Sequence, residues 1–449
     1  MHIIWRESAN VLAYEAGRLS RVFNQRCPSQ FPLAIVKPTT ESEVIKAVNL
    51  ALQHNLRIAI RAGGHSFPVW SLHDHSILID FGDFKVVEVD ERSRTAKVSP
   101  GVTSKELNDL LIEKHGMMFA GGHCPDVGLG GFLLQGGMGW NCRNWGWACE
   151  SVDALEVITT QGESIICSSQ QNSDLYWAAR GAGPAFPGVV SKFHLKLRPY
   201  SNSGFRTSGY IYPCALYKQA FSWALRITPT LDNDTEITVC TRYAQAHSQV
   251  CLSVHFVCAK TTPEEAEAAL RPVHETRPPG TLSEWYCRED NLGNLYEKQA
   301  KANPKGHRYR TDNAYVQNDA DVVAVLEEAF LTPPPGKSFA FWSAMTPWSR
   351  RELPDMALSM RSDHYFAIYA VWDDARDDEL HHSWVQKVMR QIENHSVGTY
   401  LGDSDLQKEN ARYWTNTNTT RLVEICEKWD PEGLMCRYQA SCTELQLRN

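Results

Sequence analysis

The segment RAGGHSFPVW, residues 61–70, places an imidazole and a hydroxyl directly behind two glycines and an apolar run. This composition suits an ordinary turn, the nucleophile elbow of a serine hydrolase, or a loop that holds a cofactor. The elbow motif G-x-S-x-G needs a glycine where this chain has Pro68, and proline lacks the N–H that helps to form an oxyanion hole. The hydrolase is therefore disfavoured, while the turn and the cofactor loop stay open.

A second glycine-rich segment, GGHCPDVGLGGFLLQGGMGW, surrounds Cys124. Because glycine has no Cβ and tolerates positive φ, backbone amides in such a segment can approach a ligand closely. The segment follows a Cys-Pro turn and does not fit the dinucleotide-binding pattern G-x-G-x-x-G. A single histidine or cysteine is more often structural than chemical. Together, however, His65 and Cys124 in two glycine-rich turns suit the attachment of an electrophilic cofactor.

The composition limits the function classes. A length of 449 residues is enough for two or three domains, and 43% hydrophobic and 22% charged residues are ordinary for a globular protein. The formal charge of -7 gives no electrostatic reason to expect a nucleic-acid partner. No apolar run is long enough for a signal peptide or a membrane span, and the 13 scattered cysteines are typical of buried thiols. We expect a cytoplasmic protein with no membrane partner, and no cysteine or histidine spacing predicts a metal site.

The elements that position these residues change in character near residue 200. A strand over 33–38, a helix over 40–55 with Thr40 as N-cap, and a strand over 57–64 form a β-α-β opening. Beyond residue 201 the strand signals are longer, and QVCLSVHFVCA alternates Leu252, Val254 and Phe256 with more polar residues. This alternation predicts a strand with one buried face. We expect a second, α+β domain in which helices cover one side of an antiparallel sheet.

Four segments of the first 200 residues carry a family resemblance. RAGGHS, the glycine-rich segment around Cys124, EVITTQGE and DLYWAARGAGPAFPGVVSKFHLKL resemble, in order and spacing, the flavin-binding half of the vanillyl-alcohol oxidase/p-cresol methylhydroxylase superfamily. The branch that the chain resembles is that of the berberine bridge enzyme-like oxidases, whose terminal signature is similar to NTTRLVEICEKWDPEGLM. The resemblance implies an α+β fold with a two-part FAD-binding domain over 1–200 and an antiparallel-sheet substrate domain over 201–400. It further implies a C-terminal segment, 401–449, that returns to the flavin domain.

The resemblance also implies a set of cofactor residues. In this branch FAD is bonded through its 8α carbon to the histidine of R-x-G-G-H-S and through C6 to the cysteine of G-x-C-P-x-V-G-x-G-G, which are His65 and Cys124 here. Backbone amides around three residues would hold the pyrophosphate: Gly63, Gly64 and Ser66. Three glycines would lie along the isoalloxazine and ribityl groups: Gly128, Gly130 and Gly131. The remaining residues that the resemblance assigns to the cofactor site are Arg61, Leu129, Val157 near the adenine, and Asn418.

The resemblance implies transfer of a hydride from a substrate C–H to flavin N5, with a base that takes an O–H or N–H proton. The strand HYFAIYAVW offers Tyr365 and Tyr369 on one face as candidates to supply or orient that base, although both could instead pack in the core. Plant members carry a Y-x-N-Y motif before the terminal helix. By spacing, its tyrosines fall on Gly398 and Leu401 here, with Tyr400 displaced, so the substrate class stays open.

Leu129 stands where oxygen-using members often carry valine. It is predicted either to slow the reaction of the flavin with oxygen or simply to pack. The leading hypothesis for the chain is an FAD-linked oxidoreductase that acts on an alcohol, a sugar or a secondary metabolite, with O₂ or another electron acceptor. The alternatives are a flavin-bound cyclase or isomerase that uses the same pocket, and a non-enzymatic flavoprotein.

Overall fold

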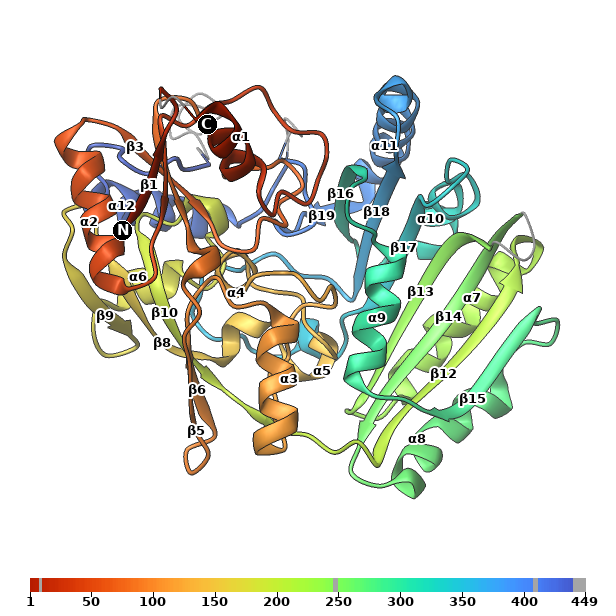
Figure 1. Cartoon of the computed structure of the whole chain (residues 1–449). Coiled ribbons are helices and arrows are strands. Elements are labelled where there is room, and N and C mark those ends of the chain that lie inside the picture. Colours follow the sequence, from red (N-terminus) through yellow and green to blue (C-terminus); the bar gives the residue numbers. More distant parts are fainter. Residues whose placement is uncertain (8–9, 245–248, 407–410, 439–449) are drawn as a thin grey trace.

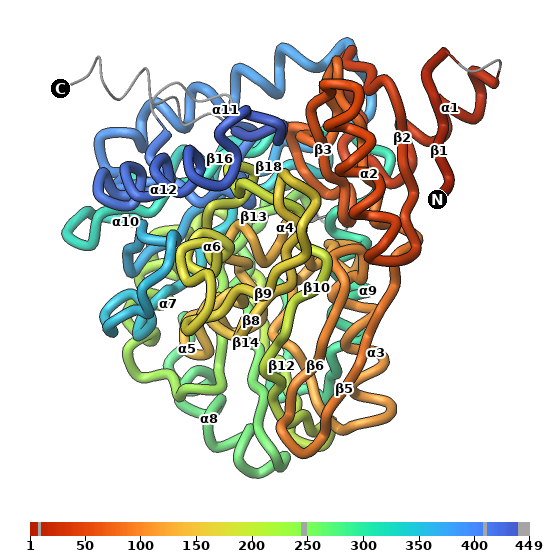
Figure 2. Tube along the Cα trace, turned by 90° about the vertical axis from the view of Figure 1, so that its left-hand side faces the viewer, coloured from red at the N-terminus to blue at the C-terminus, as the bar shows by residue number. Residues whose placement is uncertain are grey.

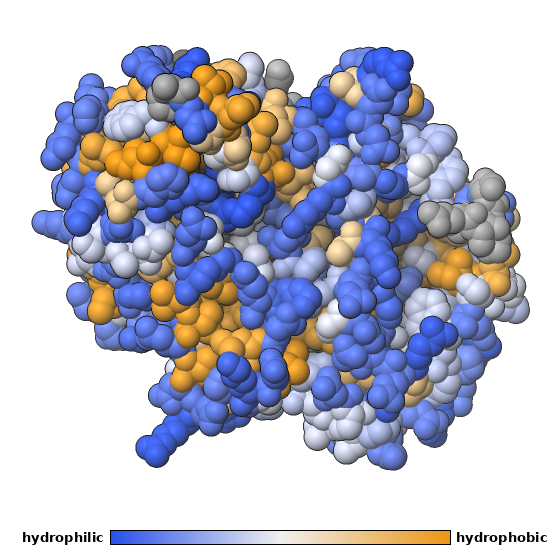
Figure 3. Space-filling view, viewed as in Figure 1, coloured by the Kyte–Doolittle hydropathy of each residue, from blue (hydrophilic) through white to orange (hydrophobic). Residues whose placement is uncertain are grey.

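Figure 1 shows the computed structural model of the chain, which describes residues 1–7, 10–244, 249–406 and 411–438. Smaller sheets occupy one half of the molecule, and a single large sheet occupies the other (Figure 1). The surface is hollowed between the two halves, and apolar side chains gather over α1 (Val11–Leu19), where Val11 and Leu12 are exposed (Figure 3). Within the described ranges, no helix combines the length and apolar character needed to span a bilayer.

The first sheet carries the His65 loop. Its strands stand in the order β1 (His2–Trp5), β2 (Ala34–Lys37), β4 (Ser76–Asp80), β3 (Arg57–Arg61), and β4 runs parallel to both β2 and β3. The helix α2 (Glu41–Gln53) begins at Thr40, whose side chain accepts the N–H of Glu43. The expected β-α-β opening is therefore present, with β4 inserted between its two strands, and the His65 loop leaves the carboxyl end of β3.

The second sheet, of five antiparallel strands, packs under the Cys124 segment. Its order is β5 (Val87–Asp90), β6 (Thr95–Val98), β10 (Val189–Lys196), β8 (Val152–Ile158), β9 (Ser164–Ser168), and a small pair joins β7 (Met117–Met118) to β11 (Arg198–Pro199). The helix α3 (Ser104–His115) has the expected capping box of Thr103 and Glu106, and it ends at Gly116 with φ 59°. Short helices complete this half: α4 (Leu129–Leu134), α5 (Cys142–Trp145) and α6 (Ser173–Ala178).

The large sheet has eight antiparallel strands. In spatial order they are β15 (Ser283–Glu289), β12 (Gly204–Pro213), β14 (Gln249–Lys260), β13 (Thr235–Ala244), β17 (Phe339–Ala344), β18 (His364–Trp372), β16 (Arg308–Val316) and β19 (Ser396–Gly398). Four helices pack on one face of the sheet: α7 (Tyr217–Ile227), α8 (Pro263–Thr276), α10 (Val322–Leu331) and α11 (Asp378–Ile392). A further helix, α9 (Leu292–Ala302), lies against α3 instead, on the side of the first half (Figure 1).

The alternation of β14 sorts its side chains between these two faces. Leu252, Val254 and Phe256 are fully buried in the core with the helices, whereas Ser253 and His255 face the space between the two halves. The predicted antiparallel sheet with helices on one side is thus confirmed, and its other face is free to line a site.

The chain returns to the first half at its C-terminal end. The helix α12 (Asn416–Trp429) lies beside α6 (Figure 2), and its residues Leu422 and Ile425 join the core of the five-stranded sheet. Residues 434–436 then pair with β3, where the N–H of Ile58 donates to the carbonyl of Leu434 at 2.7 Å and the N–H of Cys436 donates to the carbonyl of Ile58 at 2.7 Å. The expected return of the C-terminal segment is present; residues 407–410 and 439–449 lie outside the described ranges.

Candidate active site

A cavity of about 900 Å³ lies between the two halves of the molecule. Its walls come from the His65 loop, the Cys124 segment, the free face of the large sheet, α9, residues 400–404, Leu406, and residues 435–437. This volume is at the upper end of the ~300–1,000 Å³ that is usual for small-molecule and cofactor sites. Both glycine-rich segments therefore border one cavity, as the cofactor-loop interpretation requires.

The two glycine-rich segments touch backbone to backbone. A Cβ added to Gly63 would lie under 3.0 Å from the nitrogen of Gly128, and a Cβ added to Gly128 would lie equally close to the nitrogen of Gly63. Gly130 is held in a similar way, because a Cβ there would lie 2.8 Å from the Cβ atoms of both Ala62 and Pro100. Only glycine permits this approach, so the contact fixes the His65 loop against the Cys124 segment.

Arg61 anchors the start of the His65 loop. Its guanidinium is buried and donates to the carboxylate of Asp80 at 2.7 Å and to the carbonyls of Arg18 and Gly17 at 2.6 and 2.5 Å. Burial, together with the charge of the neighbouring Arg21, lowers the pKa of Arg61 to about 9. The guanidinium is thus committed to protein groups, and Arg61 contributes to the site by holding the loop.

The His65 imidazole is held between a ring and a carboxylate. It stacks on Phe23 with ring centroids 3.8 Å apart, and its Nε2 lies 3.4 Å from Oδ1 of Asp126. Although burial acts to raise the pKa of Asp126, the contacts with His65 and with Lys305 lower it on balance. Nε2 is buried and makes no hydrogen bond of good geometry. The ring orientation is therefore set by the stack and by an electrostatic contact.

Cys124 lines the same cavity as a free thiol. Burial raises the pKa of this thiol to about 12, the charges of Asp126 and Asp403 act in the same direction, and the charge of Arg242 partly opposes them. In this environment the sulfur carries its proton at neutral pH.

An acid that the sequence analysis did not select faces this thiol and imidazole. Asp403 lines the cavity, and its Oδ2 accepts a hydrogen bond from the hydroxyl of Tyr365 at 2.6 Å. Tyr369 is the second hydroxyl that donates to this carboxyl. Burial raises the pKa of Asp403, while the two hydroxyls and the charges of His123 and His65 offset part of that rise. A carboxyl in this setting can exchange a proton nearer to neutrality than an ordinary aspartate.

The two tyrosines lie on one face of β18, as the alternation predicted, and both contact Asp403. Burial and the charge of Asp403 raise the pKa of both phenols well above the usual value. They are therefore protonated donors, and the geometry favours an orienting role for them. The acid was missed because Asp403 stands in an irregular segment, TYLGDSDL, where no periodicity indicates which of its two aspartates points inward.

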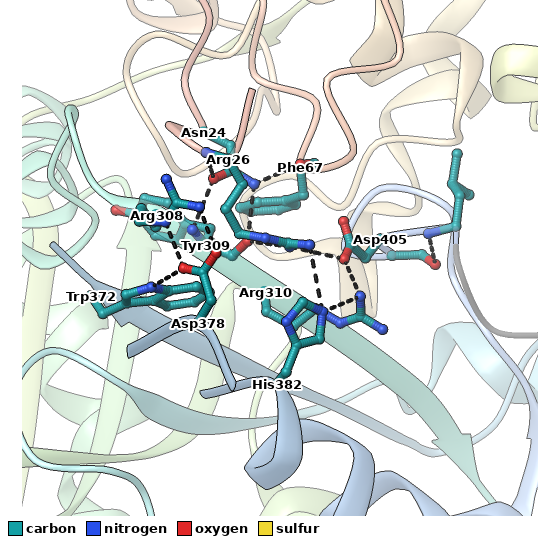
Figure 4. Close-up of polar contacts among 12 residues, drawn as sticks. Asn24, Arg26, Phe67, Arg308, Tyr309, Arg310, Trp372, Asp378, His382 and Asp405 are labelled. Carbon is teal, nitrogen blue, oxygen red and sulfur yellow. Dashed lines mark hydrogen bonds and ion pairs between the residues drawn. The ribbon is translucent and has the colours of Figure 1, made fainter. Parts of the chain in front are cut away.

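The second aspartate of that segment anchors it. Oδ2 of Asp405 lies 2.7 Å from Arg310 on β16 and 3.1 Å from Arg26 of the N-terminal segment (Figure 4). Both guanidiniums also donate toward Nε2 of His382 on α11, at 2.9 and 3.5 Å, so that this ring nitrogen acts as an acceptor (Figure 4). Burial and the two arginines lower the pKa of His382, which keeps the ring neutral. The N-terminal segment, β16, α11 and the segment that holds Asp403 thus meet at Asp405, two residues along the chain from Asp403.

The other cofactor residues expected from the resemblance divide into two groups. Gly63, Gly64, Ser66, Gly128, Gly130 and Gly131 line the cavity, whereas Leu129, Val157 and Asn418 do not. The side chains of Leu129 and Val157 are fully buried in the core of the five-stranded sheet, which favours the packing interpretation of Leu129 over an oxygen gate. The amide of Asn418 donates to the carbonyls of Met356 and Ala357, and it therefore ties α12 to that loop.

Comparison with known proteins agrees with this geometry. Residues 32–168 match the FAD binding domain family. Over 428 residues the chain is 39% identical to the FAD-linked oxidoreductase ptmO of Penicillium ochrochloron, and the match covers 95% of this chain and 94% of that protein. The chain belongs to the FAD-linked oxidoreductases.

Two solved structures share the whole fold of this FAD-linked oxidoreductase. The Physcomitrella patens BBE-like 1 protein superimposes with a TM-score of 0.81 at 19% identity, covering 97% of this chain and 95% of that one. The 6-hydroxy-D-nicotine oxidase of Arthrobacter nicotinovorans also has a TM-score of 0.81 at 19% identity, covering 98% and 97%. The predicted berberine bridge enzyme-like fold is confirmed.

The cavity of this FAD-linked oxidoreductase fits its cofactor at Gly131. A Cβ at this position would meet no protein atom within 4 Å, although the residue stands inside α4 and lines the cavity. Protein packing therefore gives no reason for glycine there, and a helix interior disfavours it relative to alanine. A bound group that occupies the open space beside the helix would account for the residue.

We expect Gly131→Ala to separate cofactor binding from stability. Alanine should leave the melting temperature equal or higher, because the helix gains ~0.5–1 kcal/mol from it. The same methyl should reduce the flavin content of the purified enzyme. Differential scanning calorimetry and the flavin-to-protein absorbance ratio measure the two effects, and an unchanged ratio would contradict the assignment of this space to FAD.

Proposed function

We propose that this enzyme holds FAD through two covalent bonds, to His65 and to Cys124, and oxidises a C–H bond of an organic substrate with Asp403 as the base. The observation that carries the proposal is a cavity in which a carboxyl with a raised pKa, oriented by two phenols, faces the loops of both attachment residues. FAD, when bound, supplies the two-electron acceptor for the hydride, and O₂ or another acceptor reoxidises it.

Asp403 suits the role of base for a physical reason. A carboxyl with a raised pKa is a stronger base than an ordinary aspartate and still loses its proton near neutral pH. Hydroxyls of Tyr365 and Tyr369 stabilise the carboxylate and direct its free lone pairs toward the cavity. The O–H or N–H proton of the substrate would move to Asp403 as the neighbouring C–H is oxidised.

The surroundings of the two attachment residues support their proposed roles. Nε2 of His65 is buried beside Asp126, so Nδ1 is the ring nitrogen available for attachment. The Phe23 stack holds the imidazole in one orientation. Cys124 would react as the thiolate, and Arg242 is the charge that lowers its pKa against the effect of burial.

Two single substitutions test the double attachment. In His65→Ala and in Cys124→Ala we expect each protein to keep a yellow, acid-stable flavin through its remaining bond, with a lower reduction potential than the parent. The double variant should release all of its flavin on acid precipitation. Cys142→Ala is the matched control, since Cys142 is a buried free thiol that does not line the cavity. A single variant that loses its entire flavin to acid would contradict two independent bonds.

Asp403→Asn should slow anaerobic reduction of the flavin by ~10²–10⁴-fold, the range for loss of a positioned base. In the parent, the rate should fall as the pH drops through the pKa of Asp403, above the ~3.9 of an ordinary aspartate. Each tyrosine lowers that pKa, so Tyr365→Phe and Tyr369→Phe should move this acid limb to higher pH.

Stopped-flow absorbance across pH measures these rates, using the fastest-reducing compound from a panel of alcohols, sugars and aromatic hydroxy acids. Asp374→Asn serves as the control, because this half-buried aspartate lies outside the cavity. If Asp403→Asn reduces the flavin at the parental rate, the base is another group.

A further inference from the structure

One row of side chains crosses the large sheet on its cavity face. Cys251 of β14 pairs with Arg242 of β13, and Phe339 of β17 pairs with Tyr369 of β18. The Arg242 guanidinium lies over the Phe339 ring, with its Cζ 4.8 Å from the centroid, and so joins the two pairs. Phe339 and Tyr369 stack with centroids 4.5 Å apart. The row therefore leads from the Arg242 cation, across the Phe339 ring, to Tyr369, the phenol that contacts Asp403.

The charge of Arg242 has no carboxylate partner among the described residues. Three other arginines have a carboxylate partner: Arg61 with Asp80, Arg308 with Asp378, and Arg310 with Asp405. The buried Arg143 donates to backbone carbonyls instead. For Arg242 the contact seen within the described ranges is the Phe339 ring. A guanidinium at a partly desolvated wall without a counter-charge is costly, and a ligand that brings the opposite charge relieves that cost.

The acids on the cavity wall are committed to other groups. Glu236 accepts the N–H of Asn141 and lies 3.6 Å from Nε2 of His123, and Asp403 holds the two tyrosines. Lys298, the neighbouring cation, is paired with Asp290. Burial lowers the pKa of His255 to about 4, and the charges of Arg242 and Lys298 add to this effect, so the neutral ring of His255 does not compete with Arg242 for an anion.

We propose that Arg242 binds a carboxylate of the substrate, which makes the substrate an organic acid with an apolar ring body. A guanidinium matches a carboxylate through two parallel hydrogen bonds. A single unpaired cation with a paired lysine beside it suits one negative charge better than a phosphate. The ring body would lie along Phe339, toward Phe67, Phe341 and Tyr309, which border the same cavity.

The proposed carboxylate site rests on Arg242 and the cavity residues around it. The position of the oxidised carbon rests in addition on the proposed function. With the carboxylate at Arg242, the ring body spans Phe339 and brings the far end of the molecule to Tyr369 and Asp403. The substrate would then be fixed at two points, at its acid group and at the proton that Asp403 removes. Such two-point fixation holds a reacting C–H in one orientation.

The test compares acids with their neutral amides in the purified holoenzyme. Isothermal titration calorimetry measures the binding of benzoate, 1-naphthoate and 9-anthroate, and separately that of the three corresponding amides. This measurement does not require turnover. We expect at least one acid to bind about 10-fold or more tightly than its amide, the size of one charge-assisted hydrogen-bonded pair. Arg242→Gln should abolish this preference, and Arg242→Lys should restore part of it.

Arg288→Gln is the matched control, because Arg288 also lies over an aromatic ring, that of Trp285 at 5.5 Å, but is exposed and outside the cavity. Equal binding of every acid and amide by the parent, or a preference that survives in Arg242→Gln, would overturn the inference. The two proposals can also fail separately. If the preference for acids depends on Arg242 but the flavin of Asp403→Asn is reduced at the parental rate, the carboxylate site stands and only the proposed base is wrong.

Discussion

The backbone contact between Gly63 and Gly128 is the constraint on which the site depends. It forces two segments more than sixty residues apart into van der Waals contact, where neither position has room for a Cβ. The Arg61–Asp80 pair fixes one side of this contact, and the packing of Gly130 on Ala62 and Pro100 fixes the other. His65 and Cys124 therefore border one cavity, in which a single group can contact both residues.

Two aspartates of one irregular segment have opposite environments and opposite roles. Asp405 is paired with Arg26 and Arg310 and serves as an anchor, whereas Asp403 accepts hydrogen bonds from two phenols, and burial raises its pKa. Burial of a carboxyl beside hydroxyl donors makes it a stronger base than an ordinary aspartate. The eight-stranded sheet makes this possible, because its buried face supplies stability and leaves its other face free for polar side chains.

The sequence predicted the features that depend on local pattern. The glycine motifs indicated both loops, His65 and Cys124, and the alternation of β14 indicated a sheet with one buried face. It also placed Tyr365 and Tyr369 on one face of their strand. The sequence did not predict Asp403, Asp405 or Arg242, because each depends on which distant segments meet across the cavity. Leu129 and Val157 were expected at the cofactor site but lie in the core, since the family motif gives a position without giving the direction of the side chain.

Peptide mass spectrometry of the holoenzyme tests the central claim most directly, that the contact between the two loops builds one attachment site from two residues. The unmodified enzyme is digested with protease and its flavin-containing fragments are sequenced. The account predicts one flavin joined to two peptides, one that contains His65 and one that contains Cys124. A flavin found on a single peptide, or released intact from the protein by acid, would contradict it.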